Sequence, residues 1–277
     1  DYPSLLGVMG PDEYAPITNN NAYTNRMVAF ALSLAATAEE DDGLRERCQL
    51  IARKLPLPRR ADGLLLQCEE FEQFAEIDFK ALWRDRTKPF AAQVSQERLY
   101  RSRCLKQADV LLLMMLFPDE FSDAEVRQAW AYYLPYTTHD SSLSPGVHAL
   151  IALRLGFADQ AWAFWERSLH LDFDGGAEEG IHIAAQGMNW QIAVFGFGGL
   201  RTAMQADVLT LNPHLPHQWT QLAFPVVWKG QQAYVEITPD GVSIENRSEQ
   251  DLTASVHETS VVIAPGQGSI WHGQAHT

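Results

Sequence analysis

The hydrophobic pattern of this chain changes its period near residue 203, and this change limits the possible folds more than any other feature. Before it, apolar residues at three- and four-residue steps and helix-end signals predict helices over residues 21–38, 42–55, 97–115, 126–133, 146–155 and 159–169. After it, short alternating or β-branched runs predict strands over residues 208–211, 223–228, 233–238, 242–245, 253–257 and 261–264. We therefore expect a mainly α-helical domain over residues 1–203, followed by a small antiparallel β-sandwich over residues 204–277.

Residues at the helix ends support this division. Ser122 and Glu125 have the spacing of a capping box, and Ser144-Pro145 places an N-cap before a proline at the first helical position. Gly156 ends one predicted helix shortly before the next one begins. Because the connectors are short, consecutive helices should pack as antiparallel pairs in layers.

The charge balance argues against some classes of partner. The chain has 277 residues with 21 Lys and Arg against 35 Asp and Glu, a net charge of −14, whereas nucleic acids and anionic membranes require a basic surface. Its longest apolar run, at residues 110–117, is far shorter than the roughly 20 residues of a membrane span. The three cysteines have no CxxC spacing, which predicts reduced, buried thiols in a cytoplasmic protein.

One polar segment, Gly-Pro-Asp-Glu-Tyr at residues 10–14, lies shortly before a predicted helix, where a side chain can face a cavity. Glu13 is a candidate general acid there, since an apolar wall and the neighbouring Asp12 would both disfavour its ionised form. The alternative is an exposed acidic pair in a turn, because most acidic residues only solvate a loop.

Three further segments carry candidate hydrogen-bond donors. Residues 137–145 place hydroxyls, an imidazole and a carboxylate before a helix N-terminus, which suits an anion, with capping as the alternative. His182 follows a glycine-bearing loop and could also donate to an anion, or could have a structural role alone. Lys106 and Gln107, within the helix predicted over residues 97–115, could donate to sugar hydroxyls or lie exposed.

Sequence patterns of several other enzyme classes are absent. The chain has no P-loop motif, no HExxH zinc motif and no Gly-x-Ser-x-Gly elbow. His139 and His148 lack companions at metal-ligand spacing. We therefore expect neither a metal nor an organic cofactor.

Taken in chain order, the segments at residues 10–14, 20–25, 106–109, 139–144, 179–182 and 196–201 resemble glycoside hydrolase family 65. This is the family of maltose, kojibiose, nigerose and trehalose phosphorylases. The resemblance spans about residues 7–201, and its motifs are specific as a set. It implies that residues 1–203 are the C-terminal portion of an (α/α)₆ barrel and that the strands after it are the family's small β-sandwich.

The resemblance also implies roles for individual residues. Glu13 would be the single general acid, which protonates the glycosidic oxygen as the aglycone leaves. Glucose would be held by Lys106 and Gln107, and inorganic phosphate by Ser141, Ser142 and His182. Phosphate is already an anionic nucleophile, so it needs positioning by donors rather than activation by a base. The implied reaction is inverting phosphorolysis of an α-glucoside disaccharide to β-glucose 1-phosphate and a free sugar, with phosphate as co-substrate.

One position departs from the family pattern. Many members have His after the Gly-Pro-Asp-Glu-Tyr block, whereas this chain has Ala15-Pro16, which weakens any inference that maltose is the substrate. An inverting hydrolase of the same family, with a carboxylate base in place of phosphate, is therefore an alternative. The candidates for that base are Asp172, Asp174, Glu178 and Glu179. A non-catalytic carbohydrate-binding or assembly fragment is the alternative of another class.

The resemblance finally predicts what else the chain needs. Glu13 is only the thirteenth residue of the chain, so we expect further barrel helices and an N-terminal sandwich outside this chain. The expected partners are the disaccharide and phosphate, together with a second copy of the chain or the missing N-terminal part. Such a fragment should expose apolar helix faces.

Overall fold

The computed structural model of the chain describes residues 2–173, 180–201 and 207–273. Its contacts define two compact units, Asp1–Val147 and His148–Thr277, and each is described by itself. This division falls within a helix and does not coincide with the change from helix to strand between residues 197 and 209. The domain boundary after residue 203 therefore stays a prediction.

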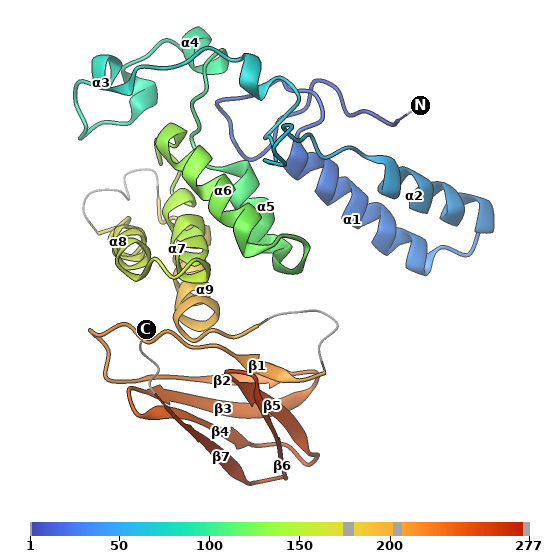
Figure 1. Cartoon of the computed structure of the whole chain (residues 1–277), viewed down its shortest axis with the longest axis vertical. Coiled ribbons are helices and arrows are strands. Elements are labelled where there is room, and N and C mark those ends of the chain that lie inside the picture. The colour runs from blue at the N-terminus through green and yellow to red at the C-terminus, as the bar shows by residue number, and fades with distance from the viewer. Residues whose placement is uncertain (1, 174–179, 202–206, 274–277) are drawn as a thin grey trace. The chain divides into compact units, whose positions relative to one another are not determined.

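The first unit is built around a helical hairpin, in which α1 (Ala22–Ala38) packs against α2 (Asp42–Lys54) (Figure 1). Asn21 begins α1 by accepting the backbone N–H of Thr24 at 2.9 Å. α1 also packs against α5 (Asp109–Leu116), which packs against α6 (Asp123–Tyr133). The capping box predicted for Ser122 and Glu125 is present at the start of α6.

Short helical segments fill the rest of this unit. They are η1 (Phe71–Gln73), α3 (Phe79–Leu82), η2 (Phe90–Ala92), α4 (Gln96–Tyr100), η3 (Pro118–Glu120) and η4 (Leu134–Tyr136). Among the described residues of both units, no helix has the length and apolar character needed to cross a membrane. The cysteines are free, with Cys68 and Cys104 buried and Cys48 half-buried.

The single helix predicted over residues 97–115 is wrong. The structure has α4 and α5 there, separated by residues 101–108. The Leu105 N–H donates to the Tyr136 carbonyl at 2.9 Å, and the Leu105 carbonyl accepts the Thr138 N–H at 2.8 Å. Because this backbone bonds to another segment rather than to its own preceding turn, Lys106 and Gln107 lie in a loop before α5.

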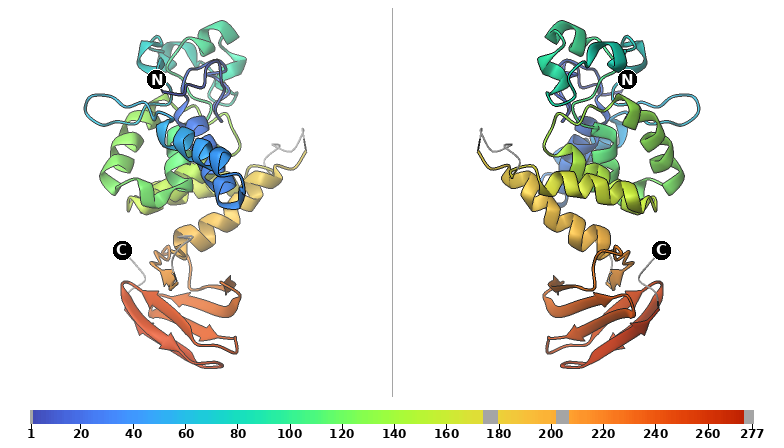
Figure 2. Two further views of the ribbon diagram at one scale, coloured as in Figure 1. Left: turned by 90° about the vertical axis from the view of Figure 1, so that its right-hand side faces the viewer. Right: turned by 90° about the vertical axis from the view of Figure 1, so that its left-hand side faces the viewer.

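Helices α8 (Ala158–Leu169) and α9 (Ile183–Gln191) belong to the second unit, and α7 (Ser144–Arg154) spans the division. Gly156, with a positive φ of 77°, follows α7 as predicted. α9 continues directly into the π-helical segment η5 (Ile192–Phe197), and Figure 2 shows the two as one rod. Neither α9 nor η5 was predicted. α9 exposes large apolar side chains, including Ile183 and Trp190.

The strands of the second unit form two sheets that share one buried core (Figure 1). One sheet is antiparallel and has the order β2 (Leu222–Trp228), β3 (Gln231–Thr238), β4 (Gly241–Asn246), β7 (Gly268–His272). The other has the order β1 (Leu209–Leu211), β5 (Leu252–Val256), β6 (Thr259–Ile263). Val235 and Ile244 of the first sheet and Ala254 of the second contribute to that core.

Two features of the sheets differ from the prediction. β1 and β5 pair in parallel, so the sandwich is not wholly antiparallel. The parallel pair is possible because β2, β3 and β4 lie between them in the chain and act as a long crossover through the other sheet. β7 was missed, because its residues are largely exposed and alternate only weakly.

Candidate functional site

Three loops that are far apart in the sequence meet in the first unit. They are the acid loop (residues 10–14), the donor turn (residues 106–107) and the serine loop (residues 139–144). The Lys106 Nζ donates to Glu13 Oε2 at 2.7 Å, across 93 residues of sequence. The Gln107 side chain donates to the Pro11 carbonyl and accepts from the Ser141 hydroxyl at 2.8 Å. All three predicted segments of this unit therefore belong to one cluster.

Asp12 lies next to Glu13 in the chain but points into the protein, where it is 1% exposed. Its Oδ1 accepts the backbone N–H groups of Lys106 at 2.8 Å and Tyr14 at 3.3 Å. Its Oδ2 accepts from the Gln67 side chain at 3.1 Å. Burial raises the pKa of Asp12 to about 6, although these donors oppose the shift. This buried carboxyl holds the backbone of both the acid loop and the donor turn.

A second buried carboxyl, that of Asp109 at the start of α5, also holds the acid loop in place. Asp109 Oδ1 accepts the Asp12 backbone N–H at 2.6 Å, and its Oδ2 accepts from the Asn21 amide at 2.9 Å. Asn21 also caps α1, so its amide cannot rotate without losing that cap. Burial, and then the charge of Asp12, raise the pKa of Asp109. A Cβ on Gly10 would lie 2.2 Å from Asp109 Oδ2, so only glycine fits there.

Glu13 itself is accessible, with 58% of its side chain exposed against 26% for Lys106. We expected an apolar wall beside this carboxylate, and the structure places the Lys106 ammonium there instead. The ammonium stabilises the charged carboxylate that remains after an acid has given up its proton. Glu13 is thus an accessible carboxylate whose charged form pairs with a cation.

The serine loop presents its hydroxyls just before α7. His139 has a positive φ of 58°, and its Nδ1 bonds to the Ser144 Oγ at 2.8 Å. The Ser141 hydroxyl is used to hold the loop to Gln107. The Ser142 side chain is half-buried and has no hydrogen-bond partner among the described residues. Within this loop, Ser142 is the hydroxyl that a ligand can engage without displacing a protein contact.

His182 lies in the second unit, immediately before α9. Its Nδ1 bonds to Asp172 Oδ1 at 2.7 Å, and Asp172 Oδ2 accepts from the Gln186 side chain at 2.9 Å. The hydrogen bond with His182 lowers the pKa of Asp172. This carboxylate therefore orients the imidazole and leaves Nε2 as the ring nitrogen available to a ligand. The other candidate bases, Asp174, Glu178 and Glu179, lie outside the described residues.

Several side chains that build the cluster had no predicted role of their own. They are Asn21, Gln67, Asp109 and Asp140. For two of them, the sequence pattern itself indicates a buried polar side chain. Gln67 interrupts the apolar run at residues 64–68, and Asp109 begins a helix whose other residues are all apolar. A polar residue inside such a run must find a buried partner.

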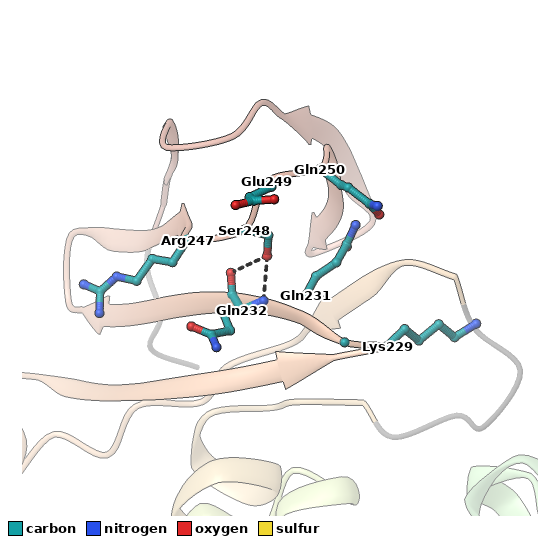
Figure 3. A pocket seen from close by; sticks show the side chains of 8 residues that line it. Lys229, Gln231, Gln232, Arg247, Ser248, Glu249 and Gln250 are labelled. Atoms are coloured by element: carbon teal, nitrogen blue, oxygen red, sulfur yellow. Dashed lines mark hydrogen bonds between the residues drawn. The ribbon is translucent and has the colours of Figure 1, made fainter.

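A polar pocket of about 490 Å³ at the turns of the β-sandwich contains none of the predicted residues (Figure 3). Ser248 Oγ accepts the Gln232 backbone N–H at 2.6 Å and donates to the Gln232 carbonyl at 3.0 Å. The Ser248 hydroxyl in this pocket thus stabilises the turn. Across residues 2–173, 180–201 and 207–273, no group of three His, Cys, Asp or Glu side chains could hold a metal ion.

A helical region that presents one accessible carboxylate beside hydroxyl groups, followed by a β-sandwich, is the arrangement that the resemblance to glycoside-processing enzymes predicts. The chain belongs to glycosyl hydrolase family 65. Residues 1–191 match the family's central catalytic domain, and residues 201–263 match its C-terminal domain. The predicted family is therefore confirmed.

Relatives in this family include proteins named as disaccharide phosphorylases. Kojibiose phosphorylase of Escherichia coli (strain K12) is 32% identical over 276 residues, which cover 95% of this chain and 36% of that relative. Maltose phosphorylase of Bacillus subtilis (strain 168) is also 32% identical, with 94% and 36% covered. The solved structure "Putative kojibiose phosphorylase from human microbiome" matches with a TM-score of 0.84 at 29% identity, over 98% of this chain and 40% of that one. The chain spans about a third of the length of these curated relatives.

Proposed function

We propose that the complete protein catalyses inverting phosphorolysis of an α-glucoside disaccharide, which yields β-glucose 1-phosphate and a free sugar. The observation that carries this proposal is the accessible carboxylate of Glu13, whose neighbours Asp12 and Asp140 accept hydrogen bonds within the protein. One carboxylic acid suffices when phosphate is the nucleophile, whereas an inverting hydrolase needs a second one, roughly 6.5–9.5 Å away, to activate water. Of the candidates for that second carboxylate, Asp172 bonds to His182, and the other three lie outside the described residues. The relatives named as phosphorylases support the same reaction class.

In the proposed reaction, Glu13 starts protonated and gives its proton to the glycosidic oxygen. The bond between this oxygen and the anomeric carbon breaks as the proton is transferred. The Lys106 ammonium, 2.7 Å from Glu13, stabilises the carboxylate that forms. Asp12 accepts hydrogen bonds from the backbones of Lys106 and Tyr14, so the separation between Glu13 and the Lys106 ammonium is fixed.

A phosphate oxygen attacks the anomeric carbon from the face opposite the leaving oxygen, so the configuration inverts. The donors proposed for phosphate are Ser141, Ser142 and His182, and those proposed for glucose are Lys106 and Gln107. Hydroxyl and imidazole donors suit an anion that needs positioning and not activation. The atoms and charges of this reaction balance with the disaccharide and phosphate alone, so no cofactor is required.

We also propose that the helices up to residue 203 form the C-terminal portion of an (α/α)₆ barrel. The remaining helices of such a barrel would cover apolar side chains that this chain exposes, such as Ile183 and Trp190. The match of residues 1–191 to the family's central catalytic domain supports this arrangement.

The test is an assay of the complete protein with trehalose, maltose, kojibiose and nigerose, each with and without inorganic phosphate. We expect glucose 1-phosphate from one of them, in its β form, only when phosphate is present. Release of glucose without phosphate would show a hydrolase. Sugar binding without turnover would show a non-catalytic module.

The role of Glu13 is tested by Glu13→Gln. General acid catalysis contributes about 10²–10⁴-fold, so kcat for the disaccharide should fall by that factor. A glucoside whose leaving group needs no proton should retain most of its rate. Glu97→Gln is a matched control, since Glu97 is exposed on α4 and takes part in none of the contacts described for the cluster. Near-wild-type turnover of the disaccharide by Glu13→Gln would exclude Glu13 as the acid.

A further inference from the structure

One hydrogen bond joins the acid loop directly to the serine loop. The Tyr14 hydroxyl donates to Asp140 Oδ2 at 2.5 Å, across 126 residues of sequence. The same oxygen accepts the backbone N–H of Ala91 at 3.2 Å. Tyr14 directly follows Glu13, and Asp140 directly precedes Ser141. The contact therefore lies one residue away from each of the groups proposed for the reaction.

Packing holds the donor of this hydrogen bond in place. Tyr14 is 7% exposed and shares a buried cluster with Phe90, Leu99 and Cys104. Burial, and then the acceptor and charge of Asp140, raise the pKa of Tyr14. The phenol thus stays protonated and donates at any working pH. A buried ring that donates to a carboxylate is a stiff link between two loops.

We propose that Tyr14 and Asp140 are positioning residues that couple proton donation by Glu13 to phosphate binding by the serine loop. This inference rests on the proposed function. Protonation and attack occur on opposite faces of one anomeric carbon, so both groups must be aligned at the same time. A misplacement of about 1 Å costs about a hundredfold in rate.

A second connection between the two loops passes through Gln107, from the Pro11 carbonyl to the Ser141 hydroxyl. The Tyr14 and Gln107 connections reach the acid loop on either side of Glu13. A displacement of the serine loop would therefore shift the backbone on both sides of Glu13. A displacement of the acid loop would likewise shift the serine loop. Loss of the Tyr14 hydrogen bond should therefore weaken phosphate binding, even though Tyr14 belongs to the acid loop.

The test is a double-mutant cycle in the complete protein with Tyr14→Phe, Asp140→Ala and the double variant. We expect Tyr14→Phe to raise KM for phosphate and to lower kcat, each about tenfold, from loss of a hydrogen bond to a charged group. Asp140→Ala should do the same, and the double variant should be no worse than the worse single one. Asp140→Asn retains an acceptor for Tyr14 and should recover part of the loss.

Tyr100→Phe is the matched control. Tyr100 packs against the same cluster, and its hydroxyl bonds to Gln96 within α4. This variant should leave both KM for phosphate and kcat unchanged. Hydrogen exchange gives a readout that is independent of turnover: amides of residues 139–147 should exchange faster in Tyr14→Phe and not in Tyr100→Phe.

Two results would overturn the coupling. One is a lower melting temperature of Tyr14→Phe with unchanged KM for phosphate and unchanged exchange of the serine loop, since that describes a purely structural contact. The other is strict additivity of the two substitutions. If the wild-type protein forms no glucose 1-phosphate while the exchange response persists, the proposed function fails and the connection between the loops stands.

Discussion

Gly10 is the position where a single added carbon should most disturb the site. A Cβ there would lie 2.2 Å from Asp109 Oδ2 and 2.6 Å from Asn21 Nδ2. Neither neighbour can move freely, because Asp109 is buried and accepts the Asp12 N–H, while Asn21 caps α1. In Gly10→Ala the acid loop itself must move, by about 1 Å, to restore an ordinary van der Waals contact.

The size of the effect follows from that displacement. A shift of about 1 Å in a proton donor costs about a hundredfold in rate, so kcat for phosphorolysis should fall by that factor. Overpacking against the buried side chains of Asp109 and Asn21 also costs about 1–3 kcal/mol of stability. The melting temperature of Gly10→Ala should therefore fall by a few degrees.

The assay is phosphate-dependent release of glucose 1-phosphate by the complete protein, together with thermal unfolding. Gly187→Ala is the matched control, since a Cβ on Gly187 in α9 would meet no atom within 4 Å. That variant should keep its activity and be as stable as the wild type or more so, because alanine favours a helix. Wild-type kcat and melting temperature in Gly10→Ala would refute the steric argument.

Three further predictions concern groups around the site. Asp12→Asn keeps the backbone contacts and lets the Gln67 Oε1, which lacks a partner among the described residues, accept from the new amide. Because the raised pKa of Asp12 gives stability below its ordinary value of 3.8 that is lost as the pH rises through about 6, the stability of the variant relative to wild type should rise by about 2 kcal/mol between unfolding measurements at pH 4 and at pH 7. Asp172→Asn should raise KM for phosphate about tenfold in a phosphate titration, because His182 loses a charged partner; an unchanged KM contradicts this. Ser122→Ala removes the capping box of α6 and should cost about 1 kcal/mol in unfolding, with kcat unchanged.

The elements that follow from local sequence were predicted well. The Ser122–Glu125 capping box, the Asn21 start of α1 and the Gly156 stop after α7 each depend on residues within one turn of the helix end. The helix predicted over residues 97–115 failed for the opposite reason. Its middle is held by backbone bonds from Leu105 to residues 136 and 138, which no local pattern shows.

The residues of the candidate site also fall into those that local sequence identifies and those that only tertiary contacts identify. Glu13, Lys106 and Ser141 were identified by their motifs, and the structure brings their loops together. The residues that position them were not identified, because Asp109 and Asp140 act through partners about a hundred residues away. Residue type shows which groups can react, whereas tertiary contacts show which groups hold them.

The separation between Tyr14 and Asp140 has a consequence for synthesis of the protein. At translation rates of roughly 5–20 residues per second, the serine loop leaves the ribosome about 6–25 s after the acid loop. For most of that interval, until residues 106 and 109 have emerged, Asp12 and Glu13 lack their partners there, and the acid loop is a solvated acidic segment. Closing so long a loop is slow and costs entropy. The active-site cluster should thus be among the last parts of this unit to form, and slowing translation before residue 140 should not impair its folding.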